Sequence, residues 1–65
     1  MTKIDAAVKV IQQAGYDALA IDYRKKPHLR AVIALTVGRD VTRRLGPELG
    51  KRTEKLLLIA AGIKA

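Results

Sequence analysis

The chain has 65 residues and a net charge of +7, with 49% hydrophobic and 29% charged residues. This length allows one domain, residues 1–65, and the composition is that of a globular chain. Because it has no cysteine and a single histidine, disulfides and thiolate metal sites are excluded, and we expect no metal and no cofactor.

Nothing in the sequence predicts a membrane segment. The longest apolar run, residues 56–61, is far shorter than the ~20 residues of a membrane-spanning helix. Residues 1–5 also lack the apolar core of a secretory signal. We therefore expect a cytoplasmic protein without a membrane partner.

Residues 2–14 are predicted to form the first helix. Thr2 can cap this helix, and Asp5 follows three residues later, in the position of a capping-box acid. The apolar spacing of one buried helix face is given by Ile4, Ala7, Val8 and Ile11. Gly15 then provides the end of the helix, because glycine adopts the left-handed conformation at little cost.

Residues 17–37 are predicted to form a β-hairpin. Leu19, Ile21 and Tyr23 alternate with small or polar residues, and the alternation resumes after a basic loop at residues 24–27. One side of the second strand would hold Leu29, Ala31, Ile33, Leu35 and Val37. The alternative is a continuous helix whose apolar face consists of Leu29, Val32, Ile33, Val37, Val41 and Leu45. Gly38 counts against that helix, because glycine is unfavourable in helix interiors.

Two further helices are predicted in the remaining chain. Asp40 can cap a short helix over residues 41–45, which ends at Gly46 and Pro47, and a last helix runs from about Gly50 to Ala61. The predicted fold is therefore α+β, in the order helix, β-hairpin, short helix, helix. The alternative is an all-α bundle of three or four helices, with a helix-turn-helix-like element formed by the last two helical segments.

The positive charge is concentrated in the middle of the chain. Residues 24–55 carry ten basic and three acidic residues, a net +7, whereas residues 1–23 carry −1 and residues 56–65 carry +1. Such a concentrated field attracts polyanions. We therefore expect a small basic nucleic-acid-binding protein with a regulatory or accessory role, for example in transcription. DNA is slightly favoured over RNA, because two tyrosines offer little aromatic surface for base stacking.

The candidate phosphate-binding residues form two clusters. The tip of the hairpin, residues 24–30, contributes Arg24, Lys25, Lys26 and Arg30. The second cluster, within residues 39–55, consists of Arg39, Arg43, Arg44, Lys51, Arg52 and Lys55. The amides of residues 50–52 would also lie at a helix N-terminus, which favours a phosphate. The alternative function is a protein–protein interaction module, a small inhibitor or adaptor that docks on an acidic surface of a larger machine.

The sequence offers no set of residues for catalysis, and we expect no enzyme activity. His28 has no neighbouring carboxylate to orient it, and no nucleophile and base can be paired. A homodimer is expected instead, because a small domain leaves part of the apolar C-terminal helix uncovered. The expected dimer interface consists of Leu56, Leu57, Ile59 and Ile63.

Overall fold

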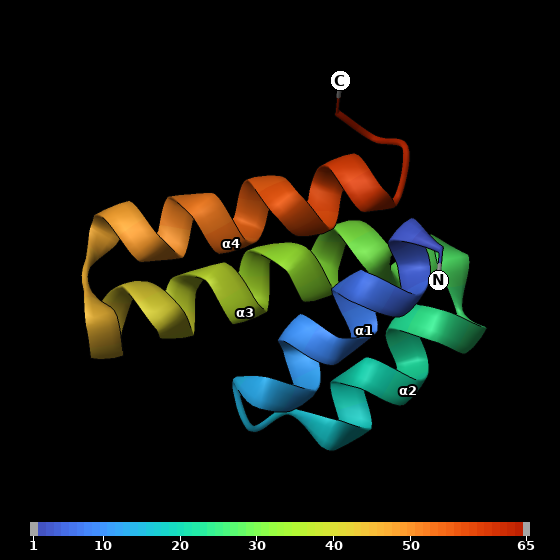
Figure 1. The fold of residues 1–65 in the computed structure, drawn as a ribbon, viewed down its shortest axis with the longest axis horizontal. Coiled ribbons are helices and arrows are strands. Elements are labelled where there is room, and N and C mark those ends of the chain that lie inside the picture. The colour runs from blue at the N-terminus through green and yellow to red at the C-terminus, as the bar shows by residue number, and fades with distance from the viewer. Residues whose placement is uncertain (1, 65) are drawn as a thin grey trace.

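The computed structural model describes residues 2–64, which form four α-helices and one short 3₁₀ turn. The helices are α1 (Lys3–Gln13), α2 (Asp17–Lys25), α3 (Arg30–Leu45) and α4 (Pro47–Ala60), and the 3₁₀ turn η1 spans Pro27–Leu29. Helices α1 and α2 form one helical hairpin, and α3 and α4 form a second, longer one (Figure 1). Helix α1 packs against α4, and α2 packs against α3. The described part of the chain is therefore all-α.

The predicted β-hairpin over residues 17–37 is wrong, since residues 2–64 contain no strand. Ile33 and Val37 fit both a strand and a helix, because residues four apart lie on one side of either element. Leu35 and Ala34 distinguish the strand from the helix. The predicted strand places Leu35 on the same side as Ile33 and Val37, but Leu35 is 45% exposed, whereas Ala34 is buried. The buried residues of α3 therefore follow the helical period, and the all-α alternative describes the fold.

The first predicted helix is confirmed together with its cap. The Asp5 backbone N–H donates to Thr2 Oγ1 at 3.1 Å, and the Thr2 N–H donates to the Asp5 carboxylate at 3.2 Å. Gly15 follows the helix with a φ of +94°, in the left-handed region that glycine enters without steric cost. This turn leads directly into α2.

The two predicted C-terminal helices are parts of longer ones. Helix α3 continues through Gly38, which is buried, and α4 begins at Pro47 and not near Gly50. Proline suits the first turn of a helix, where its missing N–H needs no partner. Gly46, with a φ of +103°, makes the reversal between the helices. The N–H of Gly50 donates to the Gly46 carbonyl at 3.1 Å, so the predicted phosphate site on the amides of residues 50–52 is wrong.

Two glycines allow α3 and α4 to pack closely. A Cβ atom on Gly50 would lie 1.7 Å from Thr42 Oγ1, and one on Gly38 would lie 2.8 Å from Glu54 Cβ. The two helices run antiparallel and side by side (Figure 1). The helix-turn-helix-like element of the all-α alternative is therefore wrong at this position, since that motif needs helices that cross at about 90–120°.

The core lies between the two helical hairpins and is mostly aliphatic. Its largest fully buried side chain is nevertheless Tyr23, from α2. The Tyr23 hydroxyl donates to the Leu57 carbonyl of α4 at 2.6 Å, so the polar end of this side chain is satisfied inside the core. The buried hydrophobic residues are Ala7, Val8, Ile11, Ala20, Tyr23, Ile33, Ala34, Val37, Val41 and Leu57.

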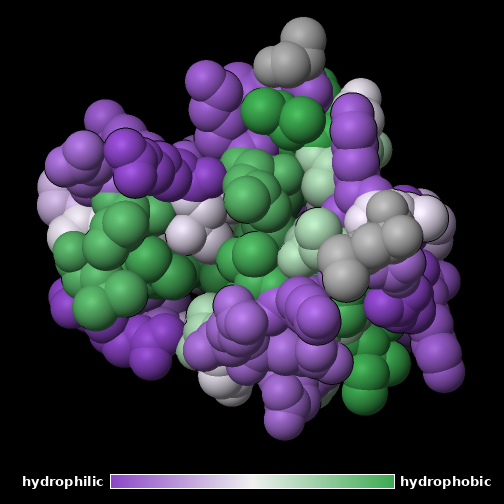
Figure 2. Space-filling model, viewed as in Figure 1, coloured by the Kyte–Doolittle hydropathy of each residue, from purple (hydrophilic) through white to green (hydrophobic). Residues whose placement is uncertain are grey.

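Several large apolar side chains remain exposed in this small fold. Leu45 and Leu49 are 64% and 44% exposed, on either side of the turn between α3 and α4. Figure 2 shows an apolar patch at that end of the molecule, on the left of the view. None of the helices within residues 2–64 has both the length and the apolarity needed to cross a bilayer.

Candidate functional site

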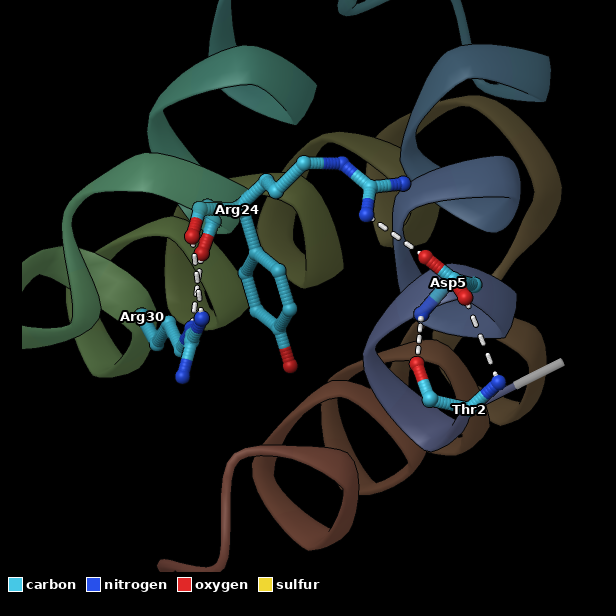
Figure 3. A network of polar contacts seen from close by, with 5 residues as sticks. Thr2, Asp5, Arg24 and Arg30 are labelled. Atoms are coloured by element: carbon cyan, nitrogen blue, oxygen red, sulfur yellow. Dashed lines mark hydrogen bonds and ion pairs between the residues drawn. The ribbon is translucent and has the colours of Figure 1, made fainter.

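Two of the ten predicted nucleic-acid-binding residues connect α2 to its neighbours. Arg24 Nη1 lies 2.6 Å from Asp5 Oδ1, which links α2 to α1 (Figure 3). Arg30 Nε donates to the Tyr23 carbonyl at 2.6 Å, and its Nη2 donates to the Arg24 carbonyl at 3.1 Å. These carbonyls lie in the last turn of α2, where a cation interacts favourably with the helix dipole. Both arginines therefore stabilise the fold.

Arg44 connects the two helical hairpins. Its Nη2 donates to the Ala14 carbonyl at 2.8 Å, and its Nε lies 3.0 Å from Asp40 Oδ2. The guanidinium also lies 5.9 Å from the centre of the Tyr16 ring. These roles cannot be predicted from local sequence, because Ala14, which accepts the hydrogen bond from Arg44, lies 30 residues away in the chain.

The predicted basic tip at residues 24–30 is not a hairpin tip. Lys25 ends α2, Lys26 follows it, and Pro27 begins η1 in the link to α3. Lys26 Nζ lies 3.6 Å from Asp22 Oδ1. Along α3, Arg39 and Arg43 lie nine and 13 residues from Arg30, or about 14 and 20 Å at the usual rise. The two predicted clusters therefore do not form one compact site.

Part of the second cluster surrounds a hollow between α3 and α4. The hollow has a volume of about 490 Å³, and we call it the α3–α4 groove. Arg39 lies two residues from both Val37 and Val41, which are buried, and a helix turns by about 100° per residue. The Arg39 side chain therefore points away from the core. The groove is lined by Gly38, Arg39, Thr42, Arg43, Gly50, Lys51 and Glu54.

Three cations and one carboxylate determine the charge of the α3–α4 groove. Arg39 and Lys51 have no ion-pair partner within residues 2–64. Arg43 lies 3.7 Å from Asp40, but its side chain is 79% exposed, and such a pair is worth little in water. All three cationic side chains can therefore give up contacts with water and bind an anionic ligand.

Arg52 and Lys55 line a different hollow, between α1 and α4, together with Lys3. Two of the predicted dimer residues, Leu56 and Ile59, also line this second hollow. Ile63 is exposed beyond the end of α4. Leu57 is fully buried in the core of the chain, so its side chain does not reach the surface.

Gly38 and Gly50 both line the α3–α4 groove, and their packing role was not predicted. Gly38 was expected to disfavour a helix and Gly50 to begin one, whereas both are buried where two helices meet. A usable signal was present, because Gly38 and Thr42 are small residues one helical turn apart. Small side chains at that spacing let a second backbone approach.

Within residues 2–64, no group of three or more His, Cys, Asp or Glu side chains could hold a metal ion. His28 is exposed in η1. Comparison with protein-family models, curated proteins and solved structures finds no match to this chain.

Proposed function

We propose that this protein binds nucleic acid through contacts between the α3–α4 groove and the phosphate backbone. The observation that carries the proposal is the convergence of Arg39 and Arg43 from α3 with Lys51 from α4 around one hollow. Arginine donors match phosphate oxygens in geometry, and each phosphate contact releases counterions. Arg24, Arg30 and Arg44 support the fold and are not part of this contact set.

Double-stranded DNA is the ligand that fits best. Tyr23 is buried and Tyr16 is partly buried, so neither offers an open ring for base stacking. Proteins that bind single strands or RNA commonly stack unpaired bases on such rings. We also propose a regulatory or accessory role in the cytoplasm. Contacts to the phosphate backbone would position the protein on DNA without reading the sequence.

The other helical hairpin is a poorer candidate for DNA contact. Helices α1 and α2 are joined by a short turn at Gly15, and α2 would be the recognition helix of a helix-turn-helix arrangement. In such motifs the N-terminal residues of the second helix contact base edges. Here Asp17 is the first residue of α2, and its carboxylate would repel the phosphates.

Fluorescence anisotropy with a random DNA duplex tests the proposal, with single-stranded DNA of the same length as a comparison. We expect the unmodified protein to bind the duplex at about 50 mM salt, in the range of non-specific binders, roughly 10⁻⁴ to 10⁻⁶ M or tighter. The triple variant Arg39→Ala, Arg43→Ala, Lys51→Ala should bind at least about tenfold more weakly. We call it the groove variant.

A matched control removes the same charge elsewhere. Lys9, Lys25 and Lys64 are exposed and have no ion pair within residues 2–64, so their combined change to alanine serves as the control variant. It should lose no more than about threefold in affinity. Equal losses in both triple variants would show diffuse attraction without a site. If the unmodified protein binds neither DNA nor RNA, the adaptor alternative replaces this proposal.

A further inference from the structure

The hollow between α1 and α4 is a second surface with its own chemistry. We call it the α1–α4 groove; it has a volume of about 470 Å³. Its floor is apolar, and its rim carries the cations of Lys3, Arg52 and Lys55. The lining residues are Lys3, Ala6, Arg52, Lys55, Leu56, Ile59 and Ala60.

No other element of the described chain covers this apolar floor. Leu56 is 43% exposed, Ala6 is exposed, and Ile59 is only partly buried. Figure 2 shows apolar side chains in the middle of the view, along the seam below α4, with hydrophilic ones on both sides. An uncovered apolar strip with a polar rim is the usual composition of a binding groove.

We propose that the α1–α4 groove binds an acidic amphipathic helix of a partner protein. The apolar face of such a helix would lie on Leu56, Ile59 and Ala6, in the helix-in-groove mode. The rim supplies three cations and no carboxylate, so acidic residues on both sides of the apolar stripe would meet complementary charge. Lys3, Arg52 and Lys55 have no ion pair within residues 2–64 that would compete.

A second copy of the chain fits this groove less well. In a twofold dimer the same patch meets itself, so the positively charged rim of Lys3, Arg52 and Lys55 would face the same rim of the second copy. A lipid surface also fits less well. Leu56 is the one lining residue that is large, apolar and exposed, and membrane binding needs more protruding apolar area than that. The observations therefore favour a helical partner with carboxylates.

The test uses a synthetic acidic peptide as the probe. The peptide has about 14 residues, with leucine at i, i+4, i+7 and i+11 and glutamate on both sides of that stripe. Titration into the isotope-labelled protein should shift the backbone amide signals of Ala6, Leu56 and Ile59. A peptide with glutamine in place of glutamate should bind about tenfold more weakly.

Two tryptophan variants locate the site. Ala6→Trp fills the groove and should weaken peptide binding by at least about tenfold. Ala18→Trp is the matched control, because Ala18 is also an exposed alanine in a helix but lies on α2. Its effect should stay within about twofold. The double variant Arg52→Gln, Lys55→Gln should weaken binding of the glutamate peptide and leave that of the glutamine peptide unchanged.

Several results would contradict this proposal and leave the proposed nucleic-acid binding by the α3–α4 groove unaffected. One is the absence of peptide-induced shifts around Ala6, and another is an equal loss of binding in both tryptophan variants. Concentration-dependent shifts of the same signals in the protein alone would identify a second copy as the occupant. Binding to phosphatidylglycerol vesicles that Ala6→Trp abolishes would identify a lipid surface.

Discussion

The hydroxyl of Tyr23 joins the two halves of the molecule inside the core. It donates from α2 to the Leu57 carbonyl of α4, while the Arg30 guanidinium lies 5.4 Å from the centre of its ring. Burial raises the pKa of the Tyr23 phenol, and the Arg30 charge opposes that shift in part. The phenol therefore remains a neutral hydrogen-bond donor through the physiological range.

Tyr23→Phe should destabilise the protein by about 1 kcal/mol, the net value of a typical hydrogen bond. The loss is modest because the Leu57 carbonyl still accepts from the Ala61 N–H at 3.2 Å. The melting temperature should fall by about 4–8 °C. Thermal unfolding followed by circular dichroism measures it. Tyr16→Phe is the control, because the Tyr16 hydroxyl donates no hydrogen bond within residues 2–64; equal shifts in both variants would contradict the assignment.

Asp5 should make stability depend on acidic pH. The hydrogen bond from Arg24, and then those from the Thr2 backbone and hydroxyl, lower the pKa of Asp5 from 3.8 to about 2. A lowered native pKa stabilises the fold above the unfolded value, and this contribution disappears as the pH falls from 3.8 towards 2.

The change Asp5→Asn should therefore lower the melting temperature at pH 7 and have little effect at pH 2. Melting curves from pH 2 to pH 7 measure both limits. Arg24→Gln should reproduce much of this pattern, because it removes the main cause of the shift. A constant difference between variant and unmodified protein across that range would contradict the assignment.

At the scale of elements, the close packing of α3 and α4 depends on their glycines. Gly50→Ala would improve intrinsic helix propensity by about 1 kcal/mol. Its Cβ atom would nevertheless lie 1.7 Å from Thr42 Oγ1 and 2.8 Å from the Gly38 carbonyl oxygen, so the helices must move apart. Overpacking of this kind costs about 1–3 kcal/mol.

We therefore expect Gly50→Ala to lower the free energy of unfolding in urea titrations, and Gly38→Ala to do so to a smaller extent. Lys51→Ala, at the exposed neighbouring position, should stay within about 0.5 kcal/mol of the unmodified protein. A Gly50→Ala variant that is more stable than the unmodified protein would show that propensity outweighs packing, and would contradict the close packing of α3 and α4 at Gly50.

The same helices show how far local sequence can predict this fold. The cap of α1 was predictable, because Thr2 and Asp5 are close in the chain and act on each other. Residues 29–37 satisfy the strand period and the helical period together, so local pattern could not decide between them. The role of Gly38 depends on Gly50, which belongs to another helix. The second basic cluster was partly predictable from charge, but its separation into two grooves depends on packing between helices.

At the scale of the whole molecule, the charges around the α1–α4 groove disfavour self-association through that surface. The predicted dimer interface included Leu57, which is buried in the core, and Leu56 and Ile59, which lie beside the cations of the α1–α4 groove. We expect no twofold dimer of the 7.1 kDa chain through that surface at low ionic strength, because like charges would face each other there. Sedimentation equilibrium measures the mass. Twice this mass in the unmodified protein, reduced to the monomer by Ala6→Trp, would contradict the charge argument.

The salt dependence of duplex binding tests the central claim, the phosphate-binding role of the α3–α4 groove, most directly. The logarithm of the association constant should fall linearly with the logarithm of the salt concentration, by about 0.9 for each phosphate neutralised. If Arg39, Arg43 and Lys51 contact phosphates, the groove variant should have a slope shallower by about two to three. The control variant, in which Lys9, Lys25 and Lys64 are changed, should keep the slope of the unmodified protein within about one. Equal slopes in the unmodified protein and the groove variant would contradict the phosphate-binding role of the α3–α4 groove.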